Sequence, residues 1–495
     1  MKTLKNTSLL FAGLLLAGAC TSAPATPDEV PTEDETPEVE TSRWIPEMKD
    51  LEFIDEDPEV VHLGESDGVS ALRVGNLKVI HMPTPANEVV SARLYFRGGA
   101  QNLTEGAAGI ERLSLAVATR GGTENTPKDE FTARLDSVGS SIGFIADRDF
   151  SAITMNSVRE HFDDTWELFE EVIFQPAFTD EEVELRRDRQ LADIDGIFDN
   201  PDALVSEVAR DLTFKGHPYY FREIGTRDTV EAFTTDELRA WQRWLLAPER
   251  MLLVVVGNVD EDHLVERVQE SLGRVASTGL EIADLPELEP SAPALRVEAM
   301  SLPTNYILGY FGAPGMDHGD YAAMVLATRH LRDRLFEEVR TRRNLTYAVS
   351  SGLGSRGTNV GFLYVTAVDP AATIPVIFDE VENMQQTPLT DQELEEVRNV
   401  FLTSHYMGLE TNSSIASQLA RSELIGGDWS QMFRFLDAVN AVTPEDIQRV
   451  ADRYIQNVQF GVVGDPEAVP GELFGVEDDA VETIDEVPDD AVSAR

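Results

Sequence analysis

The chain has little cysteine, little basic charge and no long apolar run. One cysteine among 495 residues excludes an intramolecular disulfide and a cysteine-rich zinc module. The 40 Lys and Arg residues stand against 89 Asp and Glu residues, a formal net charge of -49, with no basic patch of any length. Nucleic-acid binding needs a basic footprint, so we expect no nucleic-acid partner. No stretch approaches 18 apolar residues, so we expect no membrane-spanning helix.

The acidic charge is densest at the two ends of the chain. Residues 21–60 carry 14 acidic and 2 basic residues, and residues 463–495 carry 11 and 1. Such segments bury too little apolar surface to offset the entropy of ordering, so we expect solvated tails. The remaining acidic body indicates a highly soluble surface or, alternatively, a surface that attracts basic peptides.

The N-terminus resembles a bacterial lipoprotein signal. A short basic region with Lys2 and Lys5 precedes an apolar core of about eight residues, and small residues lead directly to Cys20. The resemblance implies removal of residues 1–19, a lipid on Cys20 and an exported, periplasmic protein tethered to a membrane through that lipid. By the same resemblance, Thr21 after the cysteine, where an Asp could stand, implies the outer membrane and not retention at the inner one. A plain signal peptide, with Cys20 incidental, is the alternative. Residues 20–60 then form an acidic linker rich in Pro, Thr and Glu.

The body of the chain contains an internal repeat. Residues 234–257 and 443–464 both have a capping Thr, acids in the first helical turn, an amphipathic helix and an apolar strand ending in Gly. Their offset of about 207–209 residues predicts two similar domains, at 61–276 and 295–466. The Pro-rich segment 277–294 links the domains, and residues 467–495 form an acidic tail.

Strands and paired helices follow one another in the same order in both domains. The first domain has expected strands at 90–98, 141–146 and 150–157 and helices at 108–120, 128–138 and within 160–213. The second has expected strands at 304–311, 346–354 and 358–367 and helices at 319–343 and within 374–440. This order predicts an α+β fold in which helices pack on one face of an antiparallel-rich sheet.

Short phrases along the body resemble the pitrilysin/insulinase-like metallopeptidases, the family that includes the mitochondrial processing peptidase. The phrases are His217-Pro218-Tyr219, Gly225-Thr226, Pro248 with the strand Leu252–Gly257, Leu335-Phe336, Arg340 and Leu345-Thr346-Tyr347. The likeness covers residues from about 70 to 466. It implies two homologous α/β-roll domains that face each other like a clam around a peptide chamber.

The zinc motif of the peptide-cleaving members is missing. Their H-x-x-E-H places two imidazoles on one helical face to bind Zn²⁺, and its Glu activates a water. Counted from Gly109, the pattern falls here on Arg112, Leu115 and Ala116, and the distal carboxylate on Asp193. The first three cannot bind zinc, and one short carboxylate cannot hold it alone. We therefore expect no metal or other cofactor in this chain.

The histidines offer no substitute by spacing. They are His62, His81, His161, His217, His263, His318, His330 and His405, and no two lie three or four residues apart. A site assembled from distant histidines is the alternative. We interpret His161 as a surface residue at a helix start and His217 as a turn-packing residue beside Pro218.

Arg340 and Tyr347 match a pair with which the family grips its substrate. In the family, an Arg and a Tyr seven residues apart in the C-terminal half reach the bound peptide. Guanidinium offers five donors for peptide oxygens, and a phenol can donate to a carbonyl that gains negative charge. The alternative is that Arg340 belongs to a surface cluster with Arg342 and Arg343, and that Tyr347 is a strand-core aromatic.

The resemblance thus implies a zinc-free, substrate-binding subunit of a heterodimeric metallopeptidase. Its partners would be a peptide and a homologous subunit that carries H-x-x-E-H and zinc. Alternatives are a non-enzymatic assembly or scaffold lipoprotein, a peptide-binding lipoprotein and a peptidase with an unconventional metal site. Mutation of Arg340 and Tyr347 and the zinc content of the purified chain distinguish them.

Overall fold

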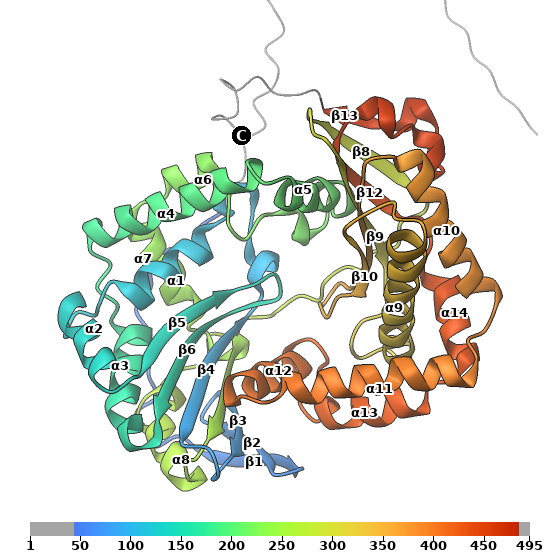
Figure 1. Cartoon of the computed structure of the whole chain (residues 1–495). Coiled ribbons are helices and arrows are strands. Elements are labelled where there is room, and N and C mark those ends of the chain that lie inside the picture. Colours follow the sequence, from blue (N-terminus) through green and yellow to red (C-terminus); the bar gives the residue numbers. More distant parts are fainter. Residues whose placement is uncertain (1–43, 485–495) are drawn as a thin grey trace, which may run out of the picture. The chain divides into compact units, whose positions relative to one another are not determined.

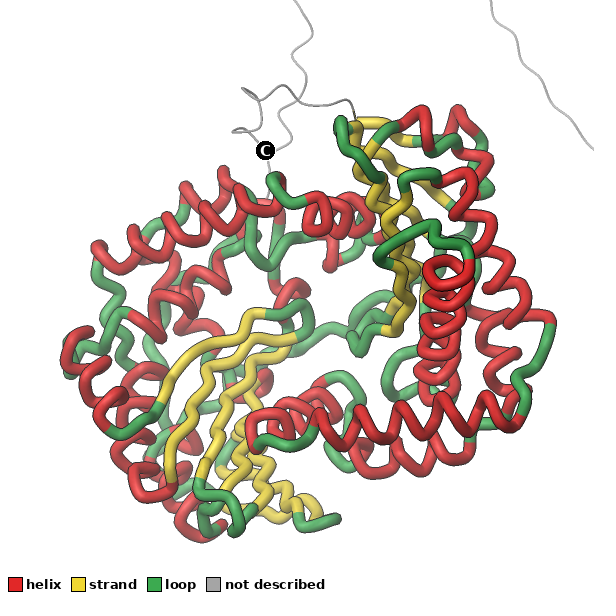
Figure 2. Tube along the Cα trace, viewed as in Figure 1, coloured by secondary structure: helices red, strands yellow, loops and turns green. Residues whose placement is uncertain are grey.

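The computed structural model describes residues 44–484. The predicted signal peptide at 1–19, the lipid attachment residue Cys20, most of the 20–60 linker and the last 11 residues of the tail lie outside the described residues, so those predictions stay predictions. The described residues belong to one compact unit. Within it, the two predicted domains each contain a twisted sheet and a layer of helices, as the chain traces show (Figures 1 and 2).

The first domain is built on a seven-stranded sheet with the order β1-β2-β3-β7-β4-β6-β5. All its neighbours are antiparallel except β3 and β7. Its strands are β1 (Val60–Ser66), β2 (Val69–Val74), β3 (Leu77–Pro83), β4 (Val89–Arg97), β5 (Ser141–Ala146), β6 (Phe150–Val158) and β7 (Met251–Gly257). Its helices are α1 (Ile110–Arg120), α2 (Lys128–Ser137), α3 (Phe162–Phe174), α4 (Asp180–Phe198), α5 (Pro201–Thr213), α6 (Arg227–Ala232), α7 (Thr235–Leu245) and α8 (Glu261–Glu270).

The second domain repeats this plan on a six-stranded sheet with the order β10-β11-β9-β12-β8-β13. Its strands are β8 (Ala294–Ala299), β9 (Asn305–Gly312), β10 (Val349–Leu353), β11 (Val360–Ala367), β12 (Gln459–Gly464) and β13 (Glu482–Ile484). Its helices are α9 (Tyr321–Leu335), the π-helical η7 (Phe336–Arg342), α10 (Pro370–Gln386), α11 (Asp391–Gly408), α12 (Asn412–Leu424), α13 (Gln431–Ala441) and α14 (Pro444–Tyr454). The run β5-β6-β4-β7-β3 has its counterpart in β10-β11-β9-β12-β8, which confirms the predicted α+β repeat.

The repeated phrases form the same local structure in both domains. Thr234 and Thr443 each cap a helix and close a capping box, through Glu237 and Asp446. The strands that follow, β7 and β12, are buried along their whole length. Both lie in the interior of their sheets, which explains why β7 is apolar throughout and why β12 is apolar after Gln459.

Each sheet is covered on one face by a helix from the other domain. The helix α12, from the second domain, packs against β4 and β7 of the first sheet, and α5, from the first domain, packs against β9 and β12 of the second (Figure 1). The first contact joins Ala416, Leu419 and Ala420 to Tyr95, Leu252 and Val254. The second joins Leu204, Val205, Val208 and Ala209 to Leu308 and Val463. The two domains are therefore interlocked by reciprocal helices.

A glycine permits the contact between α5 and the second sheet. A Cβ on Gly461 in β12 would lie 2.4 Å from the backbone nitrogen of Ala209 in α5. Any larger residue at position 461 would push α5 off the second sheet. On the other contact, Arg93 donates to Ser417 Oγ at 2.6 Å and Lys78 pairs with Glu423 at 2.5 Å.

Two segments expected to be solvated tails are in part packed on the domains. Trp44 meets the ring of Trp244 with centroids 5.4 Å apart, and the Ala276 amide donates to the Glu52 carbonyl at 2.9 Å. At the other end, Phe474 is buried against Phe460 with centroids 4.9 Å apart, and β13 pairs with β8. The tail prediction is wrong for residues 44–59 and 467–484, because a few aromatic and aliphatic residues among the acids find apolar partners.

No helix within residues 44–484 combines the length and the apolar character needed to cross a bilayer.

Candidate functional site

The positions aligned with the zinc motif lie on α1 and α4. The helix α1 starts at Gly109, whose φ of 91° and contacts with Ile224 and Gly225 exclude a side chain. Arg112 and Ala116, one turn apart, are the half-buried positions on its open side. Arg112 Nη2 donates to Asp193 Oδ2 of α4 at 3.2 Å. The structure therefore brings three of the four predicted positions together.

The fourth position, Leu115, belongs to the core. Its side chain is fully buried in the cluster between the first sheet and its helices. A glutamate at this position would have to enter that apolar cluster, at the cost of desolvating a carboxylate.

These residues do not fit a zinc ion. A guanidinium has no lone pair for a metal, alanine and leucine have no donor atom, and the single carboxylate is already paired with Arg112. Among residues 44–484, no group of three or more His, Cys, Asp or Glu side chains is arranged to hold a metal ion. No metal-dependent step can be assigned to this domain.

The second domain has a counterpart of the Arg112–Asp193 pair that sequence reasoning missed. Arg329 of α9 donates to Ser404 Oγ of α11 at 2.8 Å. Ser404 lies 14 residues after the N-cap Thr390, as Asp193 lies 14 residues after the N-cap Thr179. Each domain thus uses an arginine on its first long helix to reach the equivalent point of a second helix. The aligned N-caps were the signal that could have revealed it.

Arg340 and Tyr347 flank a tight turn in the second domain. The helix α9 continues into η7, and Asn344, with a φ of 54°, ends it. The Leu345 amide donates to the Val339 carbonyl at 3.0 Å, which reverses the chain toward β10. Thr346 Oγ1 then donates to the Ala348 carbonyl at 3.0 Å. The backbone beside Tyr347 is therefore held by local hydrogen bonds.

The alternative interpretation of this pair is wrong for Tyr347 but not for the surface position of Arg340, which is exposed beside Arg342 and Arg343. Tyr347 is 86% exposed, so it is not a strand-core aromatic. Arg342 and Arg343 are paired with Glu338, at 2.7 and 2.5 Å. Arg340 forms no side-chain hydrogen bond or ion pair with any residue of the 44–484 range, so it is not part of that paired cluster. The two side chains are presented to solvent, on a different domain from Arg112 and Asp193.

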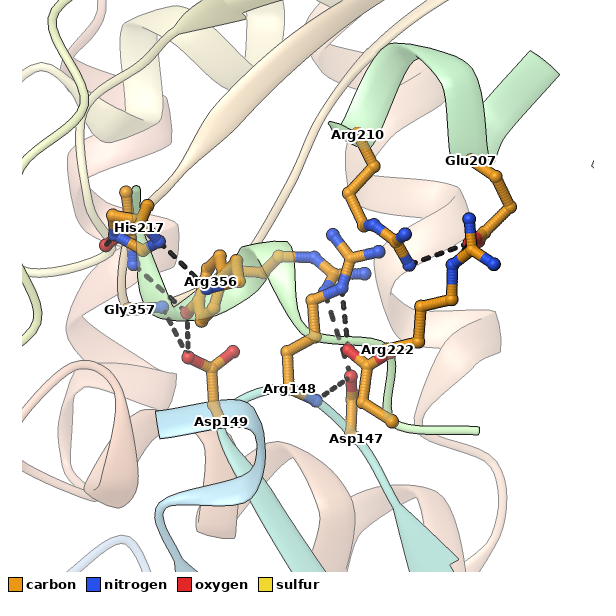
Figure 3. A network of polar contacts seen from close by, with 12 residues as sticks. Asp147, Arg148, Asp149, Glu207, Arg210, His217, Arg222, Arg356 and Gly357 are labelled. Carbon is orange, nitrogen blue, oxygen red and sulfur yellow. Dashed lines mark hydrogen bonds and ion pairs between the residues drawn. The ribbon is translucent and has the colours of Figure 1, made fainter. Parts of the chain in front are cut away.

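His217 packs in a turn, as expected, and that turn joins the two domains (Figure 3). Its Nδ1 accepts from the Tyr219 amide at 3.0 Å, so Nε2 carries the proton, and it lies 3.0 Å from Thr358 Oγ1 and 3.1 Å from the Pro286 carbonyl. Burial lowers the pKa of His217 and keeps the ring neutral. One ring therefore bridges the first domain, the linker and the second domain. The other interpreted histidine, His161, ends a short 3-10 turn at the start of α3, as expected, but it is half-buried and not fully exposed.

Asp149 is the centre of the same junction. Its Oδ1 accepts from the Tyr219 hydroxyl and from the Gly357 amide, the latter at 3.0 Å. Burial raises the pKa of Asp149, and burial together with this carboxylate raises the pKa of Tyr219. Asp147 lies 3.8 Å from Arg356 and 3.7 Å from Arg421 of the second domain. The β5–β6 and β10–β11 turns are thus tied together (Figure 3).

A cavity of about 1010 Å³ lies between the linker and both domains. Its wall carries more acidic than basic groups: the charged lining residues are Arg97, Asp149, Asp284, Glu287, Glu289, Asp317, Glu423 and Arg453. Such a wall favours positively charged groups over negatively charged ones.

Comparison with known proteins gives the class to which this fold and site belong. Residues 78–224 match the family described as "Insulinase (Peptidase family M16)", and residues 232–401 match the "Peptidase M16 inactive domain". The chain belongs to the pitrilysin/insulinase-like peptidase family. Within it, this chain lacks the zinc-binding side chains of the H-x-x-E-H motif.

Relatives support this placement over most of the chain. An uncharacterized zinc protease of Mycobacterium leprae is 25% identical over 399 residues, which cover 78% of this chain and 89% of that protein. A probable mitochondrial-processing peptidase subunit alpha of Schizosaccharomyces pombe is 22% identical over 398 residues, covering 73% and 77%.

Solved structures show the same fold. A peptidase M16 inactive domain from Pseudomonas fluorescens matches with a TM-score of 0.70 and 19% identity, over 82% of this chain and 98% of that one. The periplasmic protease PqqL from Escherichia coli matches with a TM-score of 0.70 and 14% identity, over 83% of this chain but 47% of PqqL.

Proposed function

We propose that this chain is the zinc-free, substrate-binding subunit of a heterodimeric peptidase. A homologous partner would carry H-x-x-E-H and the zinc, and this chain would contribute Arg340, Tyr347 and one wall of the peptide chamber. Two comparisons support a working unit larger than this chain. One relative is by its name a subunit of a processing peptidase, and PqqL is about twice as long as the part that matches.

The state of Arg340 carries the proposal. The neighbouring Arg342 and Arg343 are both paired with Glu338. Arg340 is held without an acidic partner among residues 44–484, and Tyr347 nearby in sequence is almost fully exposed. Both side chains therefore keep hydrogen-bonding capacity for a peptide.

The N–H groups of Arg340 and the hydroxyl of Tyr347 are available as hydrogen-bond donors to a bound peptide. A guanidinium without an acidic partner can donate to peptide carbonyls or to a substrate carboxylate, and charge-assisted bonds of this kind contribute about 1.5–3 kcal/mol each. The Tyr347 hydroxyl can donate to a carbonyl oxygen as negative charge develops there. On the first domain, the Arg112–Asp193 pair neutralises the position where catalytic members bind metal.

The test is peptidase activity of the purified complex of this chain with its zinc-bearing homologue. Arg340→Ala should lower kcat/KM by about 10–150-fold, the equivalent of one lost charge-assisted contact. Tyr347→Phe should lower it by roughly tenfold, through loss of a neutral donor. Both complexes should assemble as the wild type does, measured by size-exclusion chromatography with light scattering.

Arg434→Ala is the control, because it removes an exposed arginine of the same domain whose partner is Asp428. It should leave kcat/KM within about twofold. Wild-type activity in both the Arg340 and Tyr347 variants would refute the assignment and favour a scaffold function. Tight peptide binding by the chain alone, without cleavage by any complex, would favour a peptide-binding lipoprotein instead.

The same proposal places the subunit on the periplasmic side of a membrane, anchored through Cys20. The complex should therefore be prepared from the native, full-length chain in its own cell envelope. Recovery of that chain in the soluble fraction without detergent would count against the anchor.

A further inference from the structure

Three arginines near Arg340 in sequence form ion pairs with one carboxylate. Glu338, whose side chain is 6% exposed, contacts Arg334, Arg342 and Arg343 at 3.4, 2.7 and 2.5 Å. The hydrogen bond from Arg343 and the charges of the other two hold the pKa of Glu338 below its usual range. The carboxylate is therefore saturated with guanidinium donors.

The second acid of this segment is also occupied. Glu337 pairs with Arg342 at 3.1 Å. Both acids of this segment therefore bind arginines other than Arg340. No ion pair therefore fixes the orientation of the Arg340 guanidinium.

That orientation is set by Phe336. The guanidinium carbon of Arg340 lies 4.8 Å from the centroid of the Phe336 ring. Phe336 is 46% exposed and is not a member of the second domain's core cluster, so burial alone does not explain a phenylalanine there. The contact is a cation–π interaction between residues four apart on η7.

A guanidinium stacked on an aromatic ring keeps more free N–H donors than a guanidinium paired with a carboxylate. An ion pair with a carboxylate uses two of the five guanidinium N–H donors in its best geometry, whereas a ring face uses none of them. A guanidinium lying on Phe336 therefore keeps its full set of donors for a ligand. It also loses less side-chain freedom when the ligand arrives, because the ring already limits its positions.

We infer that Phe336 is a positioning residue for Arg340, and that Glu338 removes the competing guanidinium groups. This inference rests on the proposed function and names the device that prepares Arg340 for a peptide. Phe336 acts through Arg340 and does not itself need to touch the substrate. The π-helical turn of η7 places the ring and the guanidinium together at the surface.

The experiment is a double-mutant cycle in the peptidase complex. Phe336→Leu keeps an apolar side chain and removes the aromatic face, and it should raise KM about threefold with kcat within twofold, the size of an exposed cation–π contact. Phe336→Trp should keep the wild-type KM, because the indole ring forms a cation–π interaction at least as strong as that of phenylalanine. In the Arg340→Ala background, Phe336→Leu should have no further effect.

Two results would overturn the inference. An equal rise in KM with and without Arg340 would show that Phe336 acts on the fold or on the peptide directly. A wild-type KM for Phe336→Leu, in a complex that Arg340→Ala impairs, would show that the stack does not position the arginine.

A readout on the chain alone separates this inference from the proposed function. The ring current of Phe336 should shift the Arg340 Nε–H proton resonance upfield, and Phe336→Leu should abolish the shift, with the Arg342 resonance as control. Wild-type activity of Arg340→Ala would refute the proposed function. In that case the presence or absence of the shift would still decide whether the ring holds the arginine.

Discussion

Because α12 of the second domain packs on the first sheet, a cavity made in α12 should destabilise the sheet of the other domain. Leu419 lies on α12 of the second domain and is fully buried against the first sheet. Leu-to-Ala changes at such sites cost about 2–5 kcal/mol, and a flat sheet surface collapses poorly into a gap, so we expect about 3 kcal/mol for Leu419→Ala. At about 1.4 kcal/mol per tenfold, this is roughly a 150-fold change in an opening equilibrium.

The assay is amide hydrogen exchange followed strand by strand. Protection should fall by that factor in β4 and β7, which belong to the other domain in sequence. Val400→Ala, at a half-exposed position on α11, is the control and should change protection by less than about 0.5 kcal/mol. Unchanged exchange in β4 and β7, with faster exchange confined to the second sheet, would refute the reciprocal packing.

Two further predictions concern the degenerate metal position and the domain junction. The triple variant Arg112→His, Ala116→His and Asp193→Glu should bind about one zinc per chain by elemental analysis, because it sets two imidazoles one turn apart opposite a longer carboxylate. No zinc in that variant would show that these positions do not share a face. Asp149→Asn keeps the acceptor for Gly357 and removes a buried carboxyl whose pKa burial raises. The stability that this raised pKa gives the wild type is lost as pH rises, so the variant should gain stability relative to the wild type as pH rises above the ordinary pKa of an Asp carboxyl, measured in urea titrations. A difference that stays constant with pH would contradict the assignment.

Local signals in the sequence predicted the local structure well. The capping Thr, the acidic first turn and the apolar strand ending in Gly are short-range patterns, and they form as expected at Thr234 and Thr443. The alignment of Arg112 and Ala116 with Asp193 depended on helical periodicity and on one distance along the chain, and the ion pair agrees with it. Such features are determined by neighbours within one or two turns.

Features set by distant partners were not predictable in the same way. The apolar faces of α5 and α12 indicate burial but not which sheet they cover, because any apolar surface satisfies them. The packing of Trp44 within an acidic stretch depends on Trp241 and Trp244, some 200 residues later. A count of charges also does not show which arginine near Glu338 stays unpaired, since that depends on the geometry of η7.

Under the proposed function, the reciprocal helices and the domain junction hold the peptide-binding residues in place. A subunit that only grips a peptide needs its donors held at a fixed place relative to the chamber wall. Here Arg340 and Tyr347 belong to the second domain and the Arg112–Asp193 position to the first, so their separation is set by the interface between the domains. That interface is formed by two exchanged helices and by the contacts of Asp149 and His217 with the β10–β11 turn. None of these contacts involves Arg112, Leu115 or Ala116, so the side chains at the zinc-motif positions take no part in holding the two domains together.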